Sequence, residues 1–218
     1  MRAALESLLR ARKLDVTLTT AAPWTDVPPD RVALTGCPDL DAALGGGVRR
    51  GHLSEMIGAP SSGRATLVAS VLAAATARGE VAALVDTCDT FDPPTAASHG
   101  VDLTRVLWVR ETGDAARALK AFSLVLQAGG FGIVVLDLAD VPSAAIRRFP
   151  WTTWMRVARM VEGSDTAGLL VASDRIARSP GGTTIALAAS STPRWAGASH
   201  RARVFAGVMP EPRVVRAR

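Results

Sequence analysis

The chain has 218 residues, 48% of them hydrophobic, which is enough to bury one α/β core with small appendages. It has no apolar run of membrane-spanning length, no N-terminal apolar block typical of a signal peptide, no CxxC pair for its two cysteines and no metal-ligand spacing among its three histidines. Together with a formal net charge of +5, these features argue against a membrane protein and a disulfide scaffold, and we expect a cytoplasmic protein with reduced thiols.

Residues 1–31 are expected to form an N-terminal helix and a proline-rich linker, ahead of a core domain at residues 32–218. The helix is predicted at residues 3–13, where three leucines recur on one face: Leu5, Leu8 and Leu9. A helix this short is marginal unless its apolar stripe packs on the core or on a partner. The prolines of residues 17–31 cannot continue it, so this segment is predicted to be the linker.

The rest of the chain is organised around an eight-residue loop that runs from Gly58 to Ala65. The loop follows an apolar strand, Leu53–Ile57, and opens a helical run at residues 66–75, which is the context of a phosphate-binding P-loop. Such a loop curls its backbone N–H groups around a phosphate at the positive end of the next helix. The candidate nucleotide-binding residues here and at a later strand end are Gly58, Ser61, Ser62, Gly63, Arg64, Ala65, Thr66 and Asp137.

The loop lacks the two side chains that carry P-loop chemistry. Arg64 stands where a P-loop has Lys, and its longer, planar guanidinium is not equivalent in a tight cradle. Ala65 replaces the Ser or Thr whose hydroxyl would hold a magnesium ion, and Thr66 points to a different side of the helix. We therefore predict a degenerate P-loop with no catalytic residue, no resident cofactor and no metal. A weak site for ATP and magnesium is the alternative.

Strands and helices alternate after the loop. Apolar strands are predicted at residues 81–85, 106–109, 133–137, 168–172 and 183–189, and helices at residues 114–127 and 151–161. The alternation predicts an α/β fold with a mostly parallel central sheet flanked by helices. One strand ends in Asp137, where a nucleotide site places its second acidic residue, across from the P-loop.

The last third of the chain is strongly basic. From Arg147 onward there are 12 Arg and 4 acids, a balance of +8, whereas the preceding residues carry 13 basic and 16 acidic side chains. This asymmetry favours an anionic or acidic partner, and a solvated Arg-rich surface is the alternative. Within this third we predict a C-terminal β-hairpin, in which residues 203–208 and 213–215 pair across a turn at residues 210–212. Four arginines are candidate partner contacts: Arg201, Arg203, Arg213 and Arg216.

Trp151 and Trp154 lie three residues apart on the last predicted helix, close to several arginines. Aromatic and basic side chains together can stack on nucleic-acid bases or anchor a protein interface. A place in the core is the commoner role for such a pair, and we expect it here. Glu55, in the strand before the loop, has no predicted role.

Over residues 32–176 the chain resembles the ATPase core of RecA recombinases. The segments that carry the resemblance occur in the same order in both: Leu34–Leu44, Gly51–Leu67, Val85-Asp86 with Asp92-Pro93, Gly100-Val101-Asp102 and Ile133–Asp137. Within that superfamily the short length and the altered loop look most like the RecA-like accessory proteins of the bacterial mutasome (ImuA type). The resemblance implies a RecA-like P-loop core.

The departures from RecA concern ATP hydrolysis and DNA binding. The resemblance implies a catalytic glutamate two residues after Asp86, and Cys88 stands there. It also implies two mobile DNA-binding loops. The first is largely missing between Asp140 and Arg148, and the second, around Ser173-Asp174, lacks the Asn-Gln signal of RecA. We therefore expect no hydrolysis and weak or no direct DNA binding.

From the resemblance we expect a non-catalytic adaptor in DNA damage tolerance that supports error-prone translesion synthesis in SOS mutagenesis. The implied partners are a Y-family polymerase-like scaffold protein (ImuB type), an error-prone replicative-type polymerase in the same complex, and RecA. The N-terminal leucines and the C-terminal arginines would be separate docking surfaces. Two alternatives stay open, a weak RecA-like ATPase and a single-strand DNA-binding protein.

Overall fold

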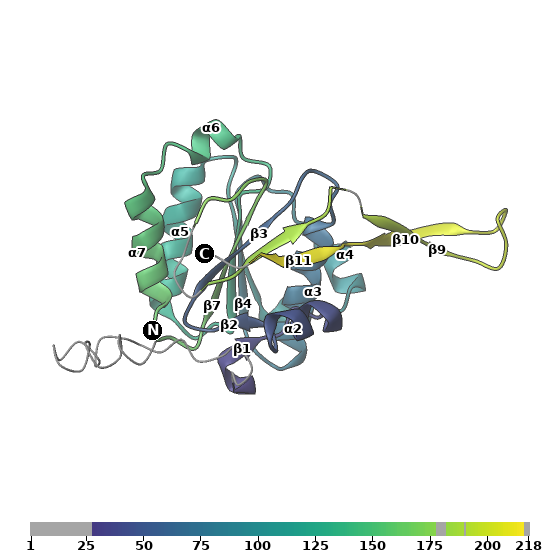
Figure 1. The fold of residues 1–218 in the computed structure, drawn as a ribbon, viewed down its shortest axis with the longest axis horizontal. Helices are drawn as coiled ribbons and strands as arrows, with labels where there is room; N and C mark the ends of the chain where they lie inside the picture. The colour runs from purple at the N-terminus through teal and green to yellow at the C-terminus, as the bar shows by residue number, and fades with distance from the viewer. Residues whose placement is uncertain (1–27, 178–181, 190, 216–218) are drawn as a thin grey trace, which may run out of the picture.

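The computed structural model describes residues 28–177, 182–189 and 191–215. In this part of the chain seven strands form one central sheet, in the order β11-β8-β3-β7-β6-β4-β5, with helices on both faces (Figure 1). The strands of this sheet are β3 (Leu53–Ile57), β4 (Ala82–Asp86), β5 (Val106–Arg110), β6 (Ile133–Asp137), β7 (Ala167–Ala172), β8 (Thr184–Leu187) and β11 (Pro212–Val215). The α/β architecture predicted from the sequence is confirmed.

The central sheet is parallel except at one edge. The six strands from β8 to β5 run parallel to one another, and β11 pairs antiparallel with β8. Parallel pairing brings the carboxyl ends of the strands to the same edge, so that Asp86 and Asp137 are register partners on β4 and β6. The loop that follows β3 starts at this same edge, which is where an open α/β sheet binds its ligands.

Six α-helices lie among the described residues: α2 (Pro38–Leu44), α3 (Arg64–Ala77), α4 (Pro93–Ser98), α5 (Ala115–Ala128), α6 (Ser143–Ile146) and α7 (Trp151–Val161). Short 3₁₀ turns are η2 (Pro29–Arg31) and η3 (Leu103–Arg105), and a two-stranded sheet joins β1 (Val32–Ala33) to β2 (Val48–Arg49). Helix starts follow local rules. Asp114, for example, caps α5 by accepting hydrogen bonds from the N–H groups of Ala116 and Arg117. None of the helices in the described ranges has the length and apolarity needed to cross a membrane.

The sheet separates two hydrophobic cores. Alternate residues of β6 point to opposite faces, so Val135 packs with α2, α3 and α4, whereas Val134 and Leu136 pack with α5, α6 and α7. All five residues of β4 and all six of β7 are buried, as expected for strands covered on both faces. Trp154 belongs to the second core and is 6% exposed, whereas Trp151 is 51% exposed. The expected core placement therefore holds for Trp154 alone.

A two-stranded antiparallel ribbon, β9 (Thr192–Ala196) with β10 (Val204–Met209), extends away from the core (Figure 1). We call residues 192–209 the arm. A C-terminal hairpin is thus present, but the strand partners predicted from the sequence are wrong: β10 pairs with β9, and β11 joins β8 in the central sheet. Pro210 and Pro212 explain the difference. Each proline favours an extended conformation in the residue before it, so the chain continues from β10 into β11 instead of reversing.

Candidate functional site

The loop between β3 and α3 lies at the carboxyl edge of the sheet. Its first residue, Gly58, donates its N–H to the carbonyl oxygen of Ala172 at the end of β7, over 3.2 Å. Gly63 caps α3 with a φ of +89°, a left-handed conformation that glycine adopts without strain. Ser61 also has a positive φ, of 63°. The loop is therefore tightly curled and tied to the sheet.

Arg64, the first residue of α3, directs its guanidinium toward the loop that follows β6. Nη1 donates to the carbonyl oxygen of Ala139 over 3.1 Å, and Nη2 lies 3.3 Å from a carboxylate oxygen of Asp140. The side chain is only 9% exposed, so this ion pair is largely shielded from solvent on the Arg64 side. The positive charge that a P-loop offers to a phosphate is paired here with an acid of the same chain.

The interior of the loop holds one hydroxyl group. Ser62 Oγ is buried and has no hydrogen-bond partner among the described residues, and a Cβ added at Gly58 would collide with it. A buried hydroxyl without a partner is typical of a site for an ordered water or an anion. Ala65 is exposed and Thr66 is partly buried, and both line a cavity beside α3. Arg64 is paired with Asp140 and Ala65 has no hydroxyl, so neither side chain supplies the contacts that a P-loop makes to a phosphate and to magnesium.

Asp137 ends β6 beside the loop. Burial raises the pKa of its carboxyl group to about 6, with Asp86 and Asp140 acting in the same direction. The N–H of Ala139, which donates to Oδ1 over 2.8 Å, and the charge of Arg64 oppose this shift. Within the described ranges no three His, Cys, Asp or Glu side chains come together as ligands for a metal ion.

Asp86, the register partner of Asp137, stabilises the loop that follows β4. Its carboxylate accepts hydrogen bonds from the N–H groups of Thr90 and Phe91 and from the indole N–H of Trp108, at 2.8 to 3.3 Å. Cys88 lies in this loop, and burial together with three nearby aspartates raises the pKa of its thiol. A protonated thiol is a poor base, so the loop contains no group at Cys88 that could prepare a water molecule.

A cavity of about 150 Å³ adjoins the loop between α3, β4 and α4. Its wall is mainly apolar and includes Leu84 and Phe91, with Thr95, His99 and Asp137 among its polar members. An apolar cavity with a few polar groups is the usual form of a small-molecule site, although this one is smaller than a typical ligand pocket.

The base of the arm contacts the loop between β3 and α3, a contact that the sequence analysis did not predict. A Cβ added at Gly63 would lie 2.8 Å from Cβ of Pro210, the residue that joins β10 to β11. Ser191 donates its hydroxyl to the carbonyl oxygen of Ser61 over 3.2 Å. Thr192, the first residue of β9, in turn donates its hydroxyl to the carboxylate of Glu211, which follows β10, over 3.0 Å. This hydrogen bond links the two ends of the arm at its base. The loop therefore supports the arm, and the arm covers part of the loop.

Glu55, on β3, has a structural role that sequence reasoning did not find. Its carboxylate is 2% exposed and accepts hydrogen bonds from the N–H groups of Ile176 and Ala177, the hydroxyl of Thr184 and the guanidinium of Arg175. It thereby fixes the segment after β7 and one end of β8. An acid in the middle of an apolar strand is the signal for such a buried network.

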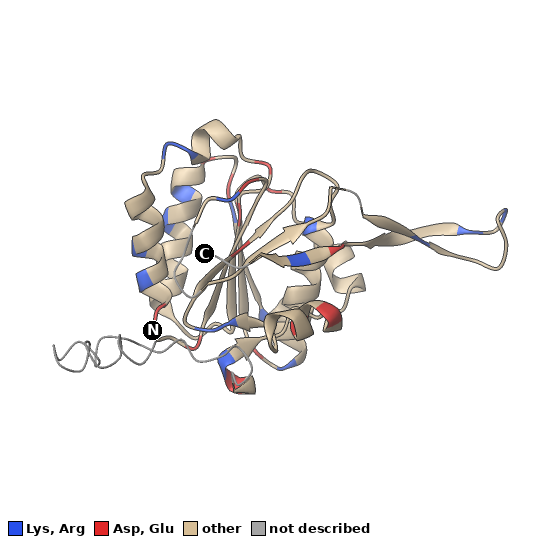
Figure 2. Cartoon of the chain, in the orientation of Figure 1, with Lys and Arg blue, Asp and Glu red and all other residues tan. Residues whose placement is uncertain are grey.

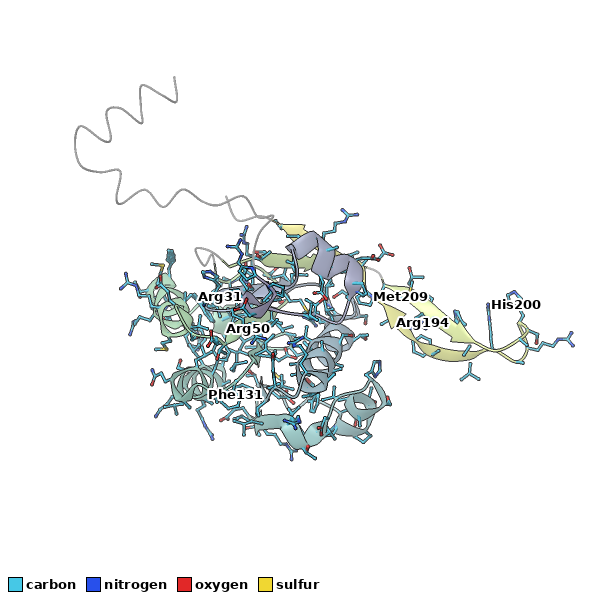
Figure 3. The ribbon with its side chains drawn as sticks, turned by 90° about the horizontal axis from the view of Figure 1, so that it is seen from below. Arg31, Arg50, Phe131, Arg194, His200 and Met209 are labelled. Carbon is cyan, nitrogen blue, oxygen red and sulfur yellow. The ribbon has the colours of Figure 1, made fainter. Side chains whose placement is uncertain are left out.

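The predicted partner-binding residues fall in different places. Arg201 and Arg203 are exposed near the tip of the arm, and Arg213 is exposed on β11. The arm also exposes large apolar side chains, namely Trp195 (51%), Val204 (70%), Phe205 (55%) and Met209 (50%). In Figure 3 Arg194 and Met209 lie toward the core and His200 toward the tip. Leu5, Leu8, Leu9 and Arg216 lie outside the described residues.

A second basic surface covers the opposite side of the molecule. Helices α5, α6 and α7 and the residues between α6 and α7 contain no acid, and they expose six cations: Arg117, Lys120, Arg147, Arg148, Arg156 and Arg159. Figure 2 shows Lys and Arg along α5 and α7. Among the described residues only Arg117 of this set forms an ion pair, with Glu111 at 3.5 Å. We call this surface the helical cation face.

Comparison with known proteins identifies one family. The model of the RecA N-terminal domain matches residues 26–148. The chain is similar to "Protein RecA" of Kineococcus radiotolerans, with 38% identity over 122 residues, which is 55% of this chain and 35% of that protein. It is also similar to "Protein RecA" of Thermus thermophilus, with 35% identity over 150 residues, 66% of this chain and 44% of that protein. The chain thus spans less than half of the length of the curated relatives it matches.

Proposed function

The chain belongs to the RecA N-terminal domain family, and we propose that within it this protein is a non-catalytic adaptor in DNA damage tolerance. In this role it supports error-prone translesion synthesis by binding a Y-family polymerase-like scaffold protein (ImuB type), in a complex with an error-prone replicative-type polymerase. RecA is a further proposed partner, on residues 1–13. The proposal extends the resemblance of the sequence to mutasome accessory proteins.

One observation carries this proposal, namely the arm. Four large apolar side chains are at least half exposed on a ribbon that the core does not cover. Exposed apolar surface on an ordered element is typical of an interaction site, because it gains nothing from the protein's own fold. The contacts of the arm's base with Gly63 and Ser61 fit the same role. The loop that holds a phosphate in P-loop proteins supports a docking element here.

The test is direct binding of the full chain to the scaffold protein, measured by calorimetry. The double variant Trp195→Ala/Phe205→Ala should weaken the complex by about 2 kcal/mol or more, as expected for central aromatic contacts. The matched control is Leu103→Ala/Leu107→Ala, which removes two exposed apolar side chains of η3 and β5, at the opposite edge of the central sheet. Equal effects of both pairs, or no binding by the wild-type chain, would refute the adaptor proposal.

Truncation of the chain after Gly207 is a poorer test of the same proposal. It would remove β11 from the central sheet together with the end of the arm, so that loss of folding and loss of docking could not be separated. Deletion of residues 1–13 remains the test for the proposed RecA contact.

A weak RecA-like ATPase is the second candidate, and the unpartnered hydroxyl of Ser62 favours it. We expect no ATP hydrolysis above background, because Arg64 is paired with Asp140, Ala65 has no hydroxyl and Cys88 stands in the place of a catalytic acid. The double change Arg64→Lys/Ala65→Thr should restore nucleotide binding before turnover. Hydrolysis that disappears in Asp137→Ala would promote the enzyme over the adaptor.

Phosphate-driven binding of single-stranded DNA is the third candidate, and the helical cation face favours it. Such binding should be weak and strongly salt-dependent, because it rests on counterion release. Fluorescence anisotropy at rising salt concentration measures it. The charge reversal Arg156→Glu/Arg159→Glu should flatten the salt dependence, and tight binding that persists at high salt would point to a groove that reads bases.

A further inference from the structure

The edge strands of the protein differ in how well they are protected against pairing with another chain. Unpaired backbone groups on an edge strand are a template for a further strand, and proteins block them with proline, charge, β-bulges or short length. Among the described edge strands of four or more residues, β5 contains Arg110, β9 contains Pro193 and Arg194, and β11 contains Pro212 and Arg213. Strand β10, Val204–Met209, contains neither proline nor charge, and its one protective feature is the register shift between Phe205 and Gly207.

Strand β10 is also open on its outer side. It belongs to a sheet of only two strands, so its single partner among the described strands is β9. Six residues at about 3.4 Å each make an edge of about 20 Å. A register shift between Phe205 and Gly207 divides it, so that an added strand could pair with Gly207–Met209, with Val204–Phe205, or with both.

The side chains beside this edge are apolar and cationic. Phe205 and Trp195 form an edge-to-face pair with ring centroids 5.7 Å apart, and the guanidinium of Arg203 lies 5.0 Å from the Trp195 ring. Residues 191–209 contain Arg194, Arg201 and Arg203 and no acid. A strand added here would therefore meet an aromatic side chain and, toward the tip, positive charge.

We propose that the partner of the arm binds by β-strand addition: an extended, acidic segment of the partner protein pairs with the outer edge of β10. Apolar side chains of that segment pack beside Phe205, and its carboxylates face Arg201 and Arg203. This inference rests on the proposed adaptor function and specifies how the arm makes its contact. Main-chain pairing supplies affinity in this mode, and the side chains on either side supply specificity.

Two other occupants of the edge fit the structure less well. A second copy of this chain would bring a second acid-free arm alongside the first, so that like charges face one another. Single-stranded DNA would use the arginines and the aromatic pair, but it cannot satisfy the row of backbone donors and acceptors on β10. Both occupants remain outcomes of the test.

Amide hydrogen exchange, resolved by residue, tests the pairing in the full chain with and without the scaffold protein. We expect amides of β10 to exchange about tenfold or more slowly in the complex. Amides of β9 that point away from β10 should change little. The charge reversal Arg201→Glu/Arg203→Glu should weaken binding about tenfold or more, whereas its matched control Arg156→Glu/Arg159→Glu, on α7, should leave it within about twofold.

The outcomes separate this inference from the adaptor proposal. Scaffold binding without protection of β10 means docking through side chains alone, which overturns strand addition and leaves the adaptor standing. If the chain does not bind the scaffold protein, both the strand-addition proposal and the adaptor proposal are refuted. Protection of β10 that grows with the concentration of the isolated chain assigns the edge to a second copy, and protection caused by single-stranded DNA assigns it to nucleic acid. Either result overturns the acidic segment as the occupant.

Discussion

Strands β3 and β9 each have five residues, and the protein uses them in opposite ways. In β3 four residues are buried and the fifth is partly buried, and even its carboxylate, at Glu55, is enclosed by donors. In β9 all five residues are exposed. The side chains of β3 are committed to the fold, whereas those of β9 contribute nothing to a core and are available to a partner. Substitutions in the two regions should therefore separate stability from binding.

The largest loss of stability is expected from Glu55→Ala. The change leaves two backbone N–H groups, the Thr184 hydroxyl and the Arg175 guanidinium without their acceptor. We expect the free energy of unfolding to fall by about 3–5 kcal/mol, the usual result of removing one partner from a buried charged network. Chemical denaturation measures it. Glu55→Gln keeps the shape and one acceptor and should cost clearly less. An equal cost would mean that the negative charge and the second acceptor oxygen, and not the shape of the side chain, explain the loss.

The next largest effect is expected at Asp137, and it has the opposite sign. Its pKa is raised from 3.8 to about 6 in the folded protein, so the fold favours the protonated acid. Between about pH 4 and pH 6 the unfolded chain loses this proton, whereas the folded chain retains it. The free energy of unfolding therefore falls as the pH rises, by about 3 kcal/mol once the folded protein has also lost the proton. Asp137→Asn should therefore stabilise the protein at pH 7 to 8 and change little near pH 4. Denaturation curves across this range measure it, and a variant that is no more stable at pH 8 than the parent would contradict the assignment.

Sequence patterns were sufficient for the core because its signals are local. Apolar runs such as Ile133–Asp137, preceded by glycines, determine both the element and its burial. The arm depends on long-range pairing instead. Thr192–Ala196 contains a proline and an arginine, and its sequence is typical of a loop. It forms a strand because it pairs with Val204–Met209.

The candidate site was predictable in outline for the same reason. The glycine spacing locates the loop, and the strand pattern locates Asp137 beside it. That Arg64 pairs with Asp140 depends on a contact between residues far apart in the chain, and so does the seat of Pro210 on Gly63. No local pattern encodes such contacts.

Gly63→Ala tests the junction between core and arm, with a smaller expected effect. The new Cβ would lie 2.8 Å from Cβ of Pro210, and alanine is strained at a φ of +89°. We expect a loss of about 1–2 kcal/mol in the free energy of unfolding. In the double variant Gly63→Ala/Pro210→Ala the two Cβ atoms still crowd each other, but without the proline ring the backbone at residue 210 can move away. The double variant should therefore recover part of the lost free energy of unfolding. A strictly additive double variant would mean that strain at φ alone is responsible and that the arm does not press on the loop.

The smallest effect on stability is expected in the arm. Trp195 and Phe205 are 51% and 55% exposed and pack edge to face with ring centroids 5.7 Å apart, and the Arg203 guanidinium lies over the Trp195 ring. Since they bury no core surface, Trp195→Ala/Phe205→Ala should change the free energy of unfolding by only about 0.5 kcal/mol, the usual range for surface substitutions. A two-stranded ribbon is marginal by itself, so the same change should open the arm locally. Trypsin should then cut faster at Arg201 and Arg203 while the core stays resistant. A large drop in global stability would show that the arm is part of the core's cooperative unit, and the contrast between β3 and β9 would fail.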